Sequence, residues 1–179
     1  GILINDPAAA GCNGLSTARI LVAVLEETPF DLIIAGQRAV DDDNFQVGPA
    51  VAEFLGIPHI SMVIKQEIID SKIRCHGTID GGTVILEAPL PALFTTQRGL
   101  NEPRYASLPG IMKAKKKPID IKTLADIGLD ADRIGKPLTR IVAMQTPPER
   151  KGGKMITGDS AQAKAVELVR ILNEEAKVI

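Results

Sequence analysis

Short apolar runs alternate with segments of helical periodicity over the first 58 residues. An apolar run at 2–4 is followed by a segment at 18–25 in which apolar residues recur at helical spacing. A second run, at 31–36, is continuously apolar, as strands buried in a parallel sheet are. Another helical pattern follows at 47–55. The order strand, helix, strand, loop, helix predicts a parallel α/β sheet with helices packed on its faces.

Capping residues set the expected limits of the two helices. Ser16 or Thr17 is predicted to cap the first helix, which should end near Thr28. Gly56 is predicted to close the second helix. The residues of the second helix that we expect to face inward are Val47, Ala50, Val51, Phe54 and Leu55.

The pattern changes at residue 60 to closely spaced β-rich runs. Runs at 60–69, 73–78 and 83–87 are separated by short polar or glycine-containing connections. Such connections are typical of an antiparallel meander. A further apolar strand is expected at 92–96, after two prolines that interrupt the meander.

The C-terminal third contains a linker and a final helix. Short extended segments are expected at 119–121 and 141–144, and residues 147–153 have the proline and glycine content of a linker. Asp159 or Ser160 is predicted to cap the last helix. Its apolar stripe comprises Ala161, Ala165, Leu168, Val169 and Leu172. We therefore expect an α/β domain over 1–146, and a linker with a C-terminal helix over 147–179.

Composition limits the classes of function. The 179 residues are enough to bury one sizeable core, and 45% hydrophobic with 24% charged residues is typical of a soluble globular domain. The formal net charge is −1 and only 3% of residues are aromatic, which argues against nucleic-acid binding. No apolar run approaches the roughly 18 residues of a transmembrane helix, so no direct membrane insertion is expected.

The cysteines and histidines are isolated from one another. Cys12 and Cys75 match neither a metal-ligand spacing nor a redox dithiol motif, so both are predicted to be free thiols. His59 and His76 likewise stand alone, and His59 is expected to have a structural or surface role. No metal site is predicted.

The segment from Gly36 to Gly48 joins the buried strand to the second helix. Ligands of parallel α/β folds bind outside the carboxyl ends of the strands, and a helix N-terminus attracts phosphate. Gly36 and Gly48 would let the backbone approach a ligand closely. The aspartates at 41–43 would repel a phosphate, but they suit hydrogen bonds to a ribose or adenine, a helix cap or a cation. A solvated loop with a helix cap fits the pattern equally well, and the residues alone leave the ligand unnamed.

The segment from residue 101 to 117 combines apolar and basic residues. Pro103 and Pro109 keep part of it out of longer regular elements. Leu108 is a candidate apolar anchor, and Ile111 and Met112 would extend it. The basic residues around it are Arg104, Lys113, Lys115, Lys116 and Lys117. An apolar anchor within a charged rim suits brief, specific docking. The alternatives are a buried loop for Leu108, solvated surface for the lysines and, more remotely, single-stranded nucleic-acid binding.

The sequence LNEPRYASLPGIMKAKKK at 100–117 resembles the signature of electron-transfer flavoprotein beta subunits, including the FixA-like branch. The resemblance extends to 35–43, to the turn at 79–82 and to the chain end, and so covers essentially the whole chain. It implies a Rossmann-like, adenine-nucleotide-binding α/β fold: a parallel sheet with flanking helices, an antiparallel β extension and a C-terminal helical arm. Family members begin with a strand, a helix and further strands before the position of Gly1. We therefore expect the domain at 1–146 to be partial and to lack its N-terminal strands.

The resemblance also implies cofactors and sites. The family forms a heterodimer with an alpha subunit that holds most of a redox-active FAD, and conventional beta subunits bury an AMP. The residues that would line the nucleotide site are Gly36, Gln37, Arg38, Ala39, Val40, Asp41, Asp42, Asp43, Asn44, Phe45, Gln46 and Val47. The residues that would recognise a partner dehydrogenase are Arg104, Tyr105, Ala106, Ser107, Leu108, Pro109, Gly110, Ile111, Met112 and Lys113. The final helix would pack against the alpha subunit.

By the same resemblance, the protein is an electron carrier rather than an enzyme. It would take electrons from acyl-CoA or related dehydrogenases, as in fatty acid oxidation, and pass them towards a membrane quinone oxidoreductase. No catalytic acid, base or nucleophile is expected. The implied location is the bacterial cytoplasm or the mitochondrial matrix.

Two alternatives follow from departures around Val47. Conventional members have Asn-Gln-Thr-Gly where this chain has Phe45-Gln46-Val47-Gly48, which removes a threonine hydroxyl. The sequence from Gln46 to Pro49 is similar to the electron-bifurcating branch, in which a second FAD replaces AMP and reacts with NADH. That branch usually has a glycine within the aspartate run, where this chain has Asp42, so both AMP and a second FAD stay open. A nucleotide-sensing module of the universal-stress type is a further alternative.

Overall fold

The computed structural model describes residues 1–134, 141–149 and 152–179. The chain forms two compact units, Gly1–Arg140 and Ile141–Ile179, and each is described by itself. Arg150 and Lys151 of the predicted linker lie outside the described residues. The domain boundary expected after residue 146 stays a prediction.

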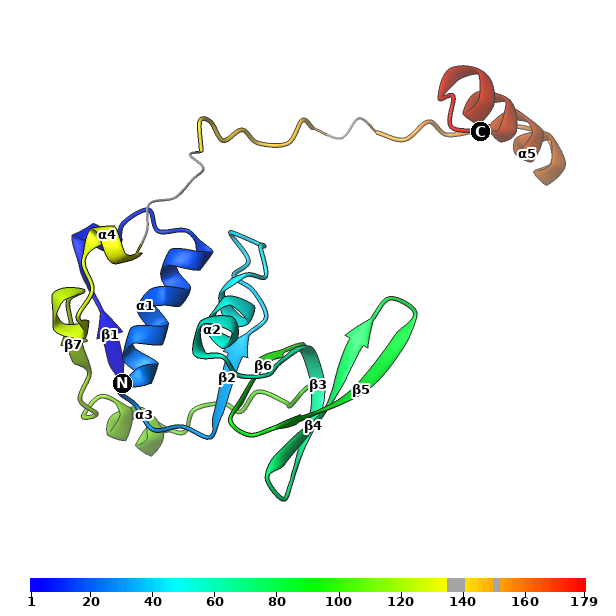
Figure 1. Ribbon diagram of the computed structural model, residues 1–179. Helices are drawn as coiled ribbons and strands as arrows, with labels where there is room; N and C mark the ends of the chain where they lie inside the picture. Colours follow the sequence, from blue (N-terminus) through cyan, green and yellow to red (C-terminus); the bar gives the residue numbers. More distant parts are fainter. Residues whose placement is uncertain (135–140, 150–151) are drawn as a thin grey trace. The chain divides into compact units, whose positions relative to one another are not determined.

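In the first unit, helices alternate with strands and are followed by an antiparallel meander (Figure 1). The first part comprises β1 (Ile2–Ile4), η1 (Pro7–Ala9), α1 (Gly14–Glu26), β2 (Leu32–Gly36) and α2 (Val47–Leu55). The next part comprises β3 (His59–Ile69), β4 (Lys72–Ile79), β5 (Gly82–Pro89) and β6 (Ala92–Thr96). The last part comprises α3 (Leu108–Ala114), β7 (Asp120–Lys122), η2 (Ala125–Ile127) and α4 (Ala131–Ile134). The mixed α/β fold predicted from the sequence is confirmed.

Five strands form the main sheet, in the order β2-β6-β3-β4-β5. β2 and β3 both pair with β6 in parallel, whereas β4 pairs antiparallel with β3 and with β5. β1 does not join this sheet but pairs in parallel with β7. The expectation that the first two predicted strands share one sheet is therefore wrong, because a short apolar run does not encode which strand it pairs with.

β3 connects the parallel and antiparallel parts of the sheet. Its start pairs with β6, its later part pairs with β4, and the register shifts between Ile60 and Val63. Met62 lies within this bulge with a φ of 55°. Its N–H donates to the Oγ1 of Thr95, a buried residue of β6, at 3.1 Å. This hydrogen bond ties the bulge to the neighbouring strand.

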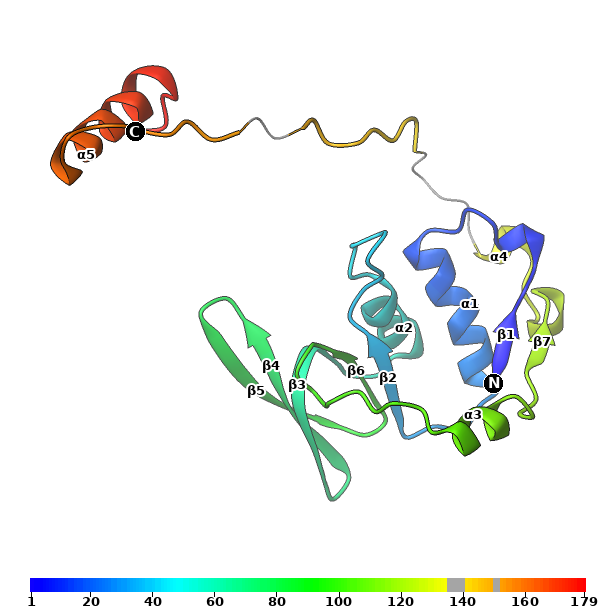
Figure 2. The same cartoon turned by 180° about the vertical axis from the view of Figure 1, so that it is seen from behind.

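Helices α1 and α2 lie side by side on one face of the sheet (Figures 1 and 2). The core beneath them comprises Ala18, Val22, Val51, Ala52 and Leu93. Because successive strand residues face opposite sides, Phe94 belongs to a second core on the other face. That core also contains Ile60, Val63, Ile73, Cys75, Ala88 and Ala92. A third core packs against the other flank of α1 and comprises Ile20, Leu124, Ile127 and Ile134.

The helix ends differ in part from the prediction. Asn13 caps α1, with its side chain accepting from Ser16 N at 2.9 Å, so the assignment of the cap to Ser16 or Thr17 is wrong. The helix begins three or four residues earlier than expected, and this places Ser16 inside it. Gly56 ends α2 with a φ of 65°, as predicted. Phe54 is 40% exposed rather than inward-facing, and the Arg19 guanidinium lies 5.2 Å from its ring centroid.

The second unit contains α5 (Ala161–Arg170), which continues into a π-helical turn, Ile171–Glu175. Ser160 caps α5 by accepting from Ala163 N at 3.1 Å, which confirms one of the two predicted caps. The short extended segment expected at 141–144 has no regular secondary structure. Ion pairs join Arg170 to Glu167 and Glu174 at 2.7 Å on the polar face of α5. In the described parts of the chain, no helix is long and apolar enough to cross a membrane.

Candidate functional site

The loop at 37–46 leaves the carboxyl end of β2 and enters α2. β2 and the adjacent β6 end in register, with Gly36 beside Thr96. The structure therefore places the whole segment from Gly36 to Val47 at the edge where parallel α/β sheets bind ligands. Its assignment to a nucleotide site stays a prediction.

Interactions between its own side chains hold this loop. The Arg38 guanidinium forms an ion pair with the Asp43 carboxylate and lies 5.0 Å from the ring centroid of Phe45. Asp43 and Phe45 have φ values of 51° and 59°, a left-handed conformation that is uncommon outside glycine. Each such residue costs about 1–3 kcal/mol and persists only where its surroundings impose the conformation. The Arg38 clamp thus bridges the two positions where the backbone is strained.

The aspartate run does not cap α2. Asp41 accepts from the backbone N–H of Asp42 at 3.0 Å, and the amide of Asn44 donates to the Asp42 carboxylate. Gln46 occupies the N-cap position without a side-chain hydrogen bond. Within residues 1–134, 141–149 and 152–179, no three His, Cys, Asp or Glu side chains converge on a possible metal site. Of the roles considered for the run, contact with a ribose or adenine and a plain solvated loop both stay predictions.

Three glycines lie at or beside the ends of the loop, and they differ in what surrounds them. A Cβ on Gly48 would lie 2.7 Å from Thr95 Cγ2, so α2 packs directly on β6 at its first turn. This close packing is by itself a sufficient reason for a glycine at position 48, and approach of the backbone to a ligand there stays a prediction. A Cβ on Gly36 would meet nothing within 4 Å. Gly14, the first residue of α1, lies against the loop, because its Cβ would be 3.1 Å from Gln46 Oε1.

The N-terminus of α1 is therefore a neighbour of the candidate site that the sequence reasoning missed. Gly14 is buried and a Cβ on it would also lie 3.5 Å from Asn44 Nδ2. The two glycines at 11 and 14 marked a loop in the sequence, but nothing in it indicated which segment the loop would contact. Tertiary packing supplies that information.

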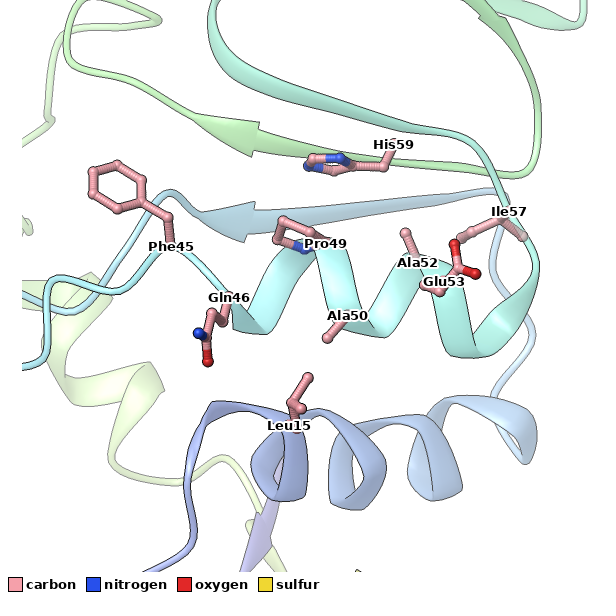
Figure 3. Close-up of a pocket in the computed structure, with 9 residues that line it drawn as sticks. All are labelled: Leu15, Phe45, Gln46, Pro49, Ala50, Ala52, Glu53, Ile57 and His59. Carbon is pink, nitrogen blue, oxygen red and sulfur yellow. The ribbon is translucent and has the colours of Figure 1, made fainter. Parts of the chain in front are cut away.

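A cavity of about 580 Å³ lies along α2, with Leu15 of α1 on one side and His59 of β3 on the other (Figure 3). Phe45 and Gln46 form its wall at the loop end, and His59 forms a wall opposite Pro49. The remaining lining residues are Leu15, Ala50, Ala52, Glu53 and Ile57. Its volume lies within the range of small-molecule sites. The last residues of the loop thus face a hollow that is mostly apolar.

His59 is the titratable ring at this cavity. Partial burial lowers the pKa of His59 below its ordinary value, because desolvation disfavours the imidazolium. Its Nε2 lies 3.2 Å from the Ser61 hydroxyl. A partly buried ring with one hydroxyl partner agrees with the structural or surface role expected for His59.

The segment at 101–117, which we call the docking segment, is exposed at every residue. Its centre is α3, which Ser107 caps by accepting from Gly110 N at 3.2 Å. Leu108 is 74% exposed at the first position of α3, so the alternative of a buried loop does not hold for it. Ile111 and Met112 are 41% and 54% exposed on the same short helix. The structure therefore brings together the apolar anchor and its expected neighbours.

Basic residues follow the apolar part of the docking segment. Lys113 lies in the last turn of α3, where a cation complements the helix dipole, and Lys115, Lys116 and Lys117 follow directly. Arg104 precedes α3 and is also exposed. Tyr105, next to Arg104, is fully exposed. The arrangement is an apolar patch with cations on both sides, and its partner stays a prediction.

The chain is similar to known proteins over most of its length. Residues 1–127 match the family model described as the electron transfer flavoprotein domain. The chain is 41% identical to the electron transfer flavoprotein subunit beta of Bacillus subtilis, covering 92% of this chain and 63% of that protein. It is 38% identical to the Bos taurus protein of the same name, covering 96% of this chain and 67% of that protein.

A third relative has a different name. The caffeyl-CoA reductase-Etf complex subunit CarD of Acetobacterium woodii is 36% identical, with 97% of this chain and 67% of that protein covered. The chain thus spans about two thirds of the length of these relatives. The family model covers well over half of the chain, and the named relatives agree with it. The chain belongs to the electron transfer flavoprotein beta-subunit family.

Proposed function

We propose that this chain acts as the beta subunit of a heterodimeric electron carrier, with an alpha subunit that holds most of a redox-active FAD. The observation that carries the proposal is the match to the electron transfer flavoprotein domain together with the beta-subunit relatives. Electrons pass from acyl-CoA or related dehydrogenases to a quinone oxidoreductase. The chain contributes nucleotide binding and docking, and no bond-making chemistry.

The nucleotide binds at the loop from Gly36 to Val47. The location at the carboxyl ends of β2 and β6 supports this assignment. Three aspartates accompany Arg38, and Arg38 is already paired with Asp43, so the loop itself carries net negative charge. Such a loop repels phosphate and instead accepts hydrogen bonds from ribose hydroxyls or an adenine amino group. The adenosine part of AMP or FAD is therefore the portion that this loop holds.

The docking segment engages the partner dehydrogenase. An exposed leucine at the start of a short helix provides an anchor for an apolar pocket, and the flanking cations attract an acidic rim. The interaction has to be brief, because a carrier must leave its donor to reach its acceptor. A small patch meets that requirement better than a large apolar surface does.

A second candidate is a bifurcating beta subunit that binds its own FAD and reacts with NADH. Val47 favours it, because a valine at the first position of α2 offers no hydroxyl to a phosphate. Similarity to CarD, named for a caffeyl-CoA reductase-Etf complex, is consistent with it. Asp42 stands where the bifurcating branch usually has a glycine, and the Leu108 anchor resembles that of conventional members. The conventional carrier therefore stays the leading proposal.

The experiment is to co-express the chain with its alpha subunit, purify the complex and count the nucleotides released on denaturation. One FAD and one AMP per heterodimer is the expected result. Two FAD without AMP would replace the conventional carrier by the bifurcating candidate. Failure to bind any alpha subunit, with a free nucleotide-binding chain, would instead support the sensing module of the universal-stress type.

A further inference from the structure

Thr95 of β6 lies beside both ends of the loop at 37–46. β6 pairs in parallel with β2, and in that register Thr95 is the partner of Ala35, close to the end of β2. At the other end of the loop, a Cβ on Gly48 would lie 2.7 Å from Thr95 Cγ2 and 3.7 Å from Ala35 Cβ. Thr95 itself is 3% exposed. The strand that leads into the loop and the helix that follows it therefore meet at one buried side chain.

The hydroxyl of Thr95 is bonded to the bulge in β3. In the register between β3 and β6, two residues, Ser61 and Met62, stand opposite the single residue Thr95. The Met62 N–H donates to Thr95 Oγ1 at 3.1 Å. The bulge is tightly packed, because a Cβ on Gly77 would lie 3.0 Å from the carbonyl oxygen of Ser61. The hydroxyl is thus bonded to a backbone segment that neighbouring strands enclose on both sides.

One side-chain torsion links these two contacts of Thr95. Threonine is branched at Cβ, so a single χ1 angle places its hydroxyl and its methyl group together. With the hydroxyl at Met62, the methyl group lies toward Gly48. A rotation that takes the methyl group away from Gly48 also breaks the hydrogen bond, and a partly buried backbone N–H then loses its acceptor. The hydrogen bond therefore keeps the methyl group in contact with α2.

We propose that Thr95 is a positioning residue for the nucleotide site: its bond to Met62 fixes the methyl group that sets the spacing between the end of β2 and the first turn of α2. The role assigned to Thr95 rests on the function proposed above, in which the loop between these two elements holds the adenosine part of a nucleotide. Asp43 and Phe45 of that loop have left-handed backbones, which the surrounding structure has to impose. A fixed spacing of the loop ends is one such constraint, and a preorganised loop binds its ligand at a lower entropic cost.

The first test separates the two groups of Thr95 in the heterodimer with the alpha subunit. Thr95→Val keeps a methyl group and removes the acceptor of the Met62 N–H, whereas Thr95→Ser keeps the acceptor and removes the methyl group. Each variant should raise the dissociation rate of AMP at least about fivefold, because the spacing of the loop ends is no longer fixed. Dissociation of AMP at the wild-type rate from both variants would overturn the proposal.

The second test moves the methyl group from the strand to the helix. Gly48→Ala alone places a Cβ at 2.7 Å from the methyl group of Thr95, and Thr95→Ser alone leaves that space empty. The double variant combines the added methyl group with the space for it, so it should retain AMP better than either single variant does. Additive losses in the double variant would overturn the role of this contact.

The matched control for both tests is Ile73→Val. It also removes one methyl group from a fully buried residue of the same sheet, but Ile73 belongs to the core on the face opposite α2. The Ile73→Val heterodimer should release AMP at the wild-type rate. Equal acceleration in Ile73→Val and Thr95→Ser would show that general loss of packing, rather than the position of Thr95, governs retention of the nucleotide.

Hydrogen exchange of the backbone amides at 37–46 distinguishes a failure at Thr95 from a failure of the proposed function, because it needs no bound nucleotide. A wild-type heterodimer that holds no adenine nucleotide would contradict the proposed function. Exchange at 37–46 should still be faster in Thr95→Val and Thr95→Ser than in the wild type and in Ile73→Val. Unchanged exchange in both Thr95 variants would overturn the positioning role, whatever the heterodimer binds.

Discussion

The loop at 37–46 and the docking segment at 101–117 are both exposed connections, but they are stabilised in different ways. The loop is held by an ion pair, a cation–π contact and hydrogen bonds among its own side chains. The docking segment has few side-chain bonds, and it exposes apolar side chains instead. A loop that is fixed in advance suits a small polar ligand, whereas an exposed apolar helix suits a protein surface that it leaves again. The predictions below test this difference from its largest expected effect to its smallest.

The packing of α2 on β6, where the loop ends, should have the largest effect on the free energy of unfolding. Gly48→Ala puts a Cβ at 2.7 Å from Thr95 Cγ2, and relieving the overlap should destabilise the fold by about 1–3 kcal/mol. Gly36→Ala is the control, because its Cβ has open space and the change should stay within about 0.5 kcal/mol. Urea unfolding measures both. Equal stability of the two variants would show that the loop does not depend on this packing.

Loss of the anchor should affect docking and leave the fold unchanged. Leu108→Ala removes a side chain that is 74% exposed, so the free energy of unfolding should change by less than about 0.5 kcal/mol. If Leu108 enters an apolar pocket, reduction of the heterodimer by its dehydrogenase should slow about tenfold. Stopped-flow flavin bleaching measures this rate. Ile79→Ala, which changes a 59% exposed residue of β4, serves as the control, and unchanged kinetics in Leu108→Ala would contradict the docking role.

The clamp in the loop should matter more for the nucleotide than for stability. Arg38→Met removes both the ion pair with Asp43 and the cation–π contact with Phe45. Because these groups are partly exposed, the loss of stability should be about 1 kcal/mol or less. Nucleotide retained per purified heterodimer should nevertheless fall, since the strained residues lose their partner. Lys65→Met, which also removes one positive charge, is the control. Full retention of nucleotide by the Arg38→Met heterodimer would refute preorganisation of the loop.

The smallest effect concerns the pH dependence of His59. Burial lowers the pKa of His59, so below the ordinary value of about 6.5 the unfolded chain takes up a proton that the folded chain resists. The free energy of unfolding should therefore fall as pH drops through this range and level off below the folded pKa. His59→Gln should flatten this part of the profile by less than about 0.5 kcal/mol, since the ring is only partly buried. Urea midpoints measured between pH 7 and pH 5 provide the comparison, and an unchanged slope would contradict it.

Much of this fold can be predicted from periodicity alone. The meander follows from β-rich runs with short polar or glycine-containing connections, and β6 from an apolar run after two prolines. Pairing cannot be predicted in this way, because β1 is as apolar as β2 but bonds to β7. Helix limits fail for a local reason: Asn13, Ser16 and Thr17 all have side chains that cap helices, and only the backbone decides which one does.

The position of the candidate site was predicted from the sequence, but the contacts that hold its loop in place were not. The position of the loop after β2 and the exposure of Leu108 both follow from sequence order and proline placement. The clamp between Arg38 and Phe45 depends on two left-handed residues that are not glycine, which no local preference predicts. The contact between Gly14 and Gln46 joins segments about thirty residues apart and exists only in the folded chain.

Thr95 connects the candidate site to the antiparallel part of the sheet. The methyl group of Thr95 limits how closely the first turn of α2 can approach the sheet, and its hydroxyl accepts from Met62 in the bulge of β3. The antiparallel hairpins extend beyond that bulge, and the loop at 37–46 ends at that turn. Thr95 therefore contacts both the bulge of β3 and the first turn of α2. A displacement of the bulge that moves Thr95 would therefore also press on the first turn of α2, where the loop at 37–46 ends.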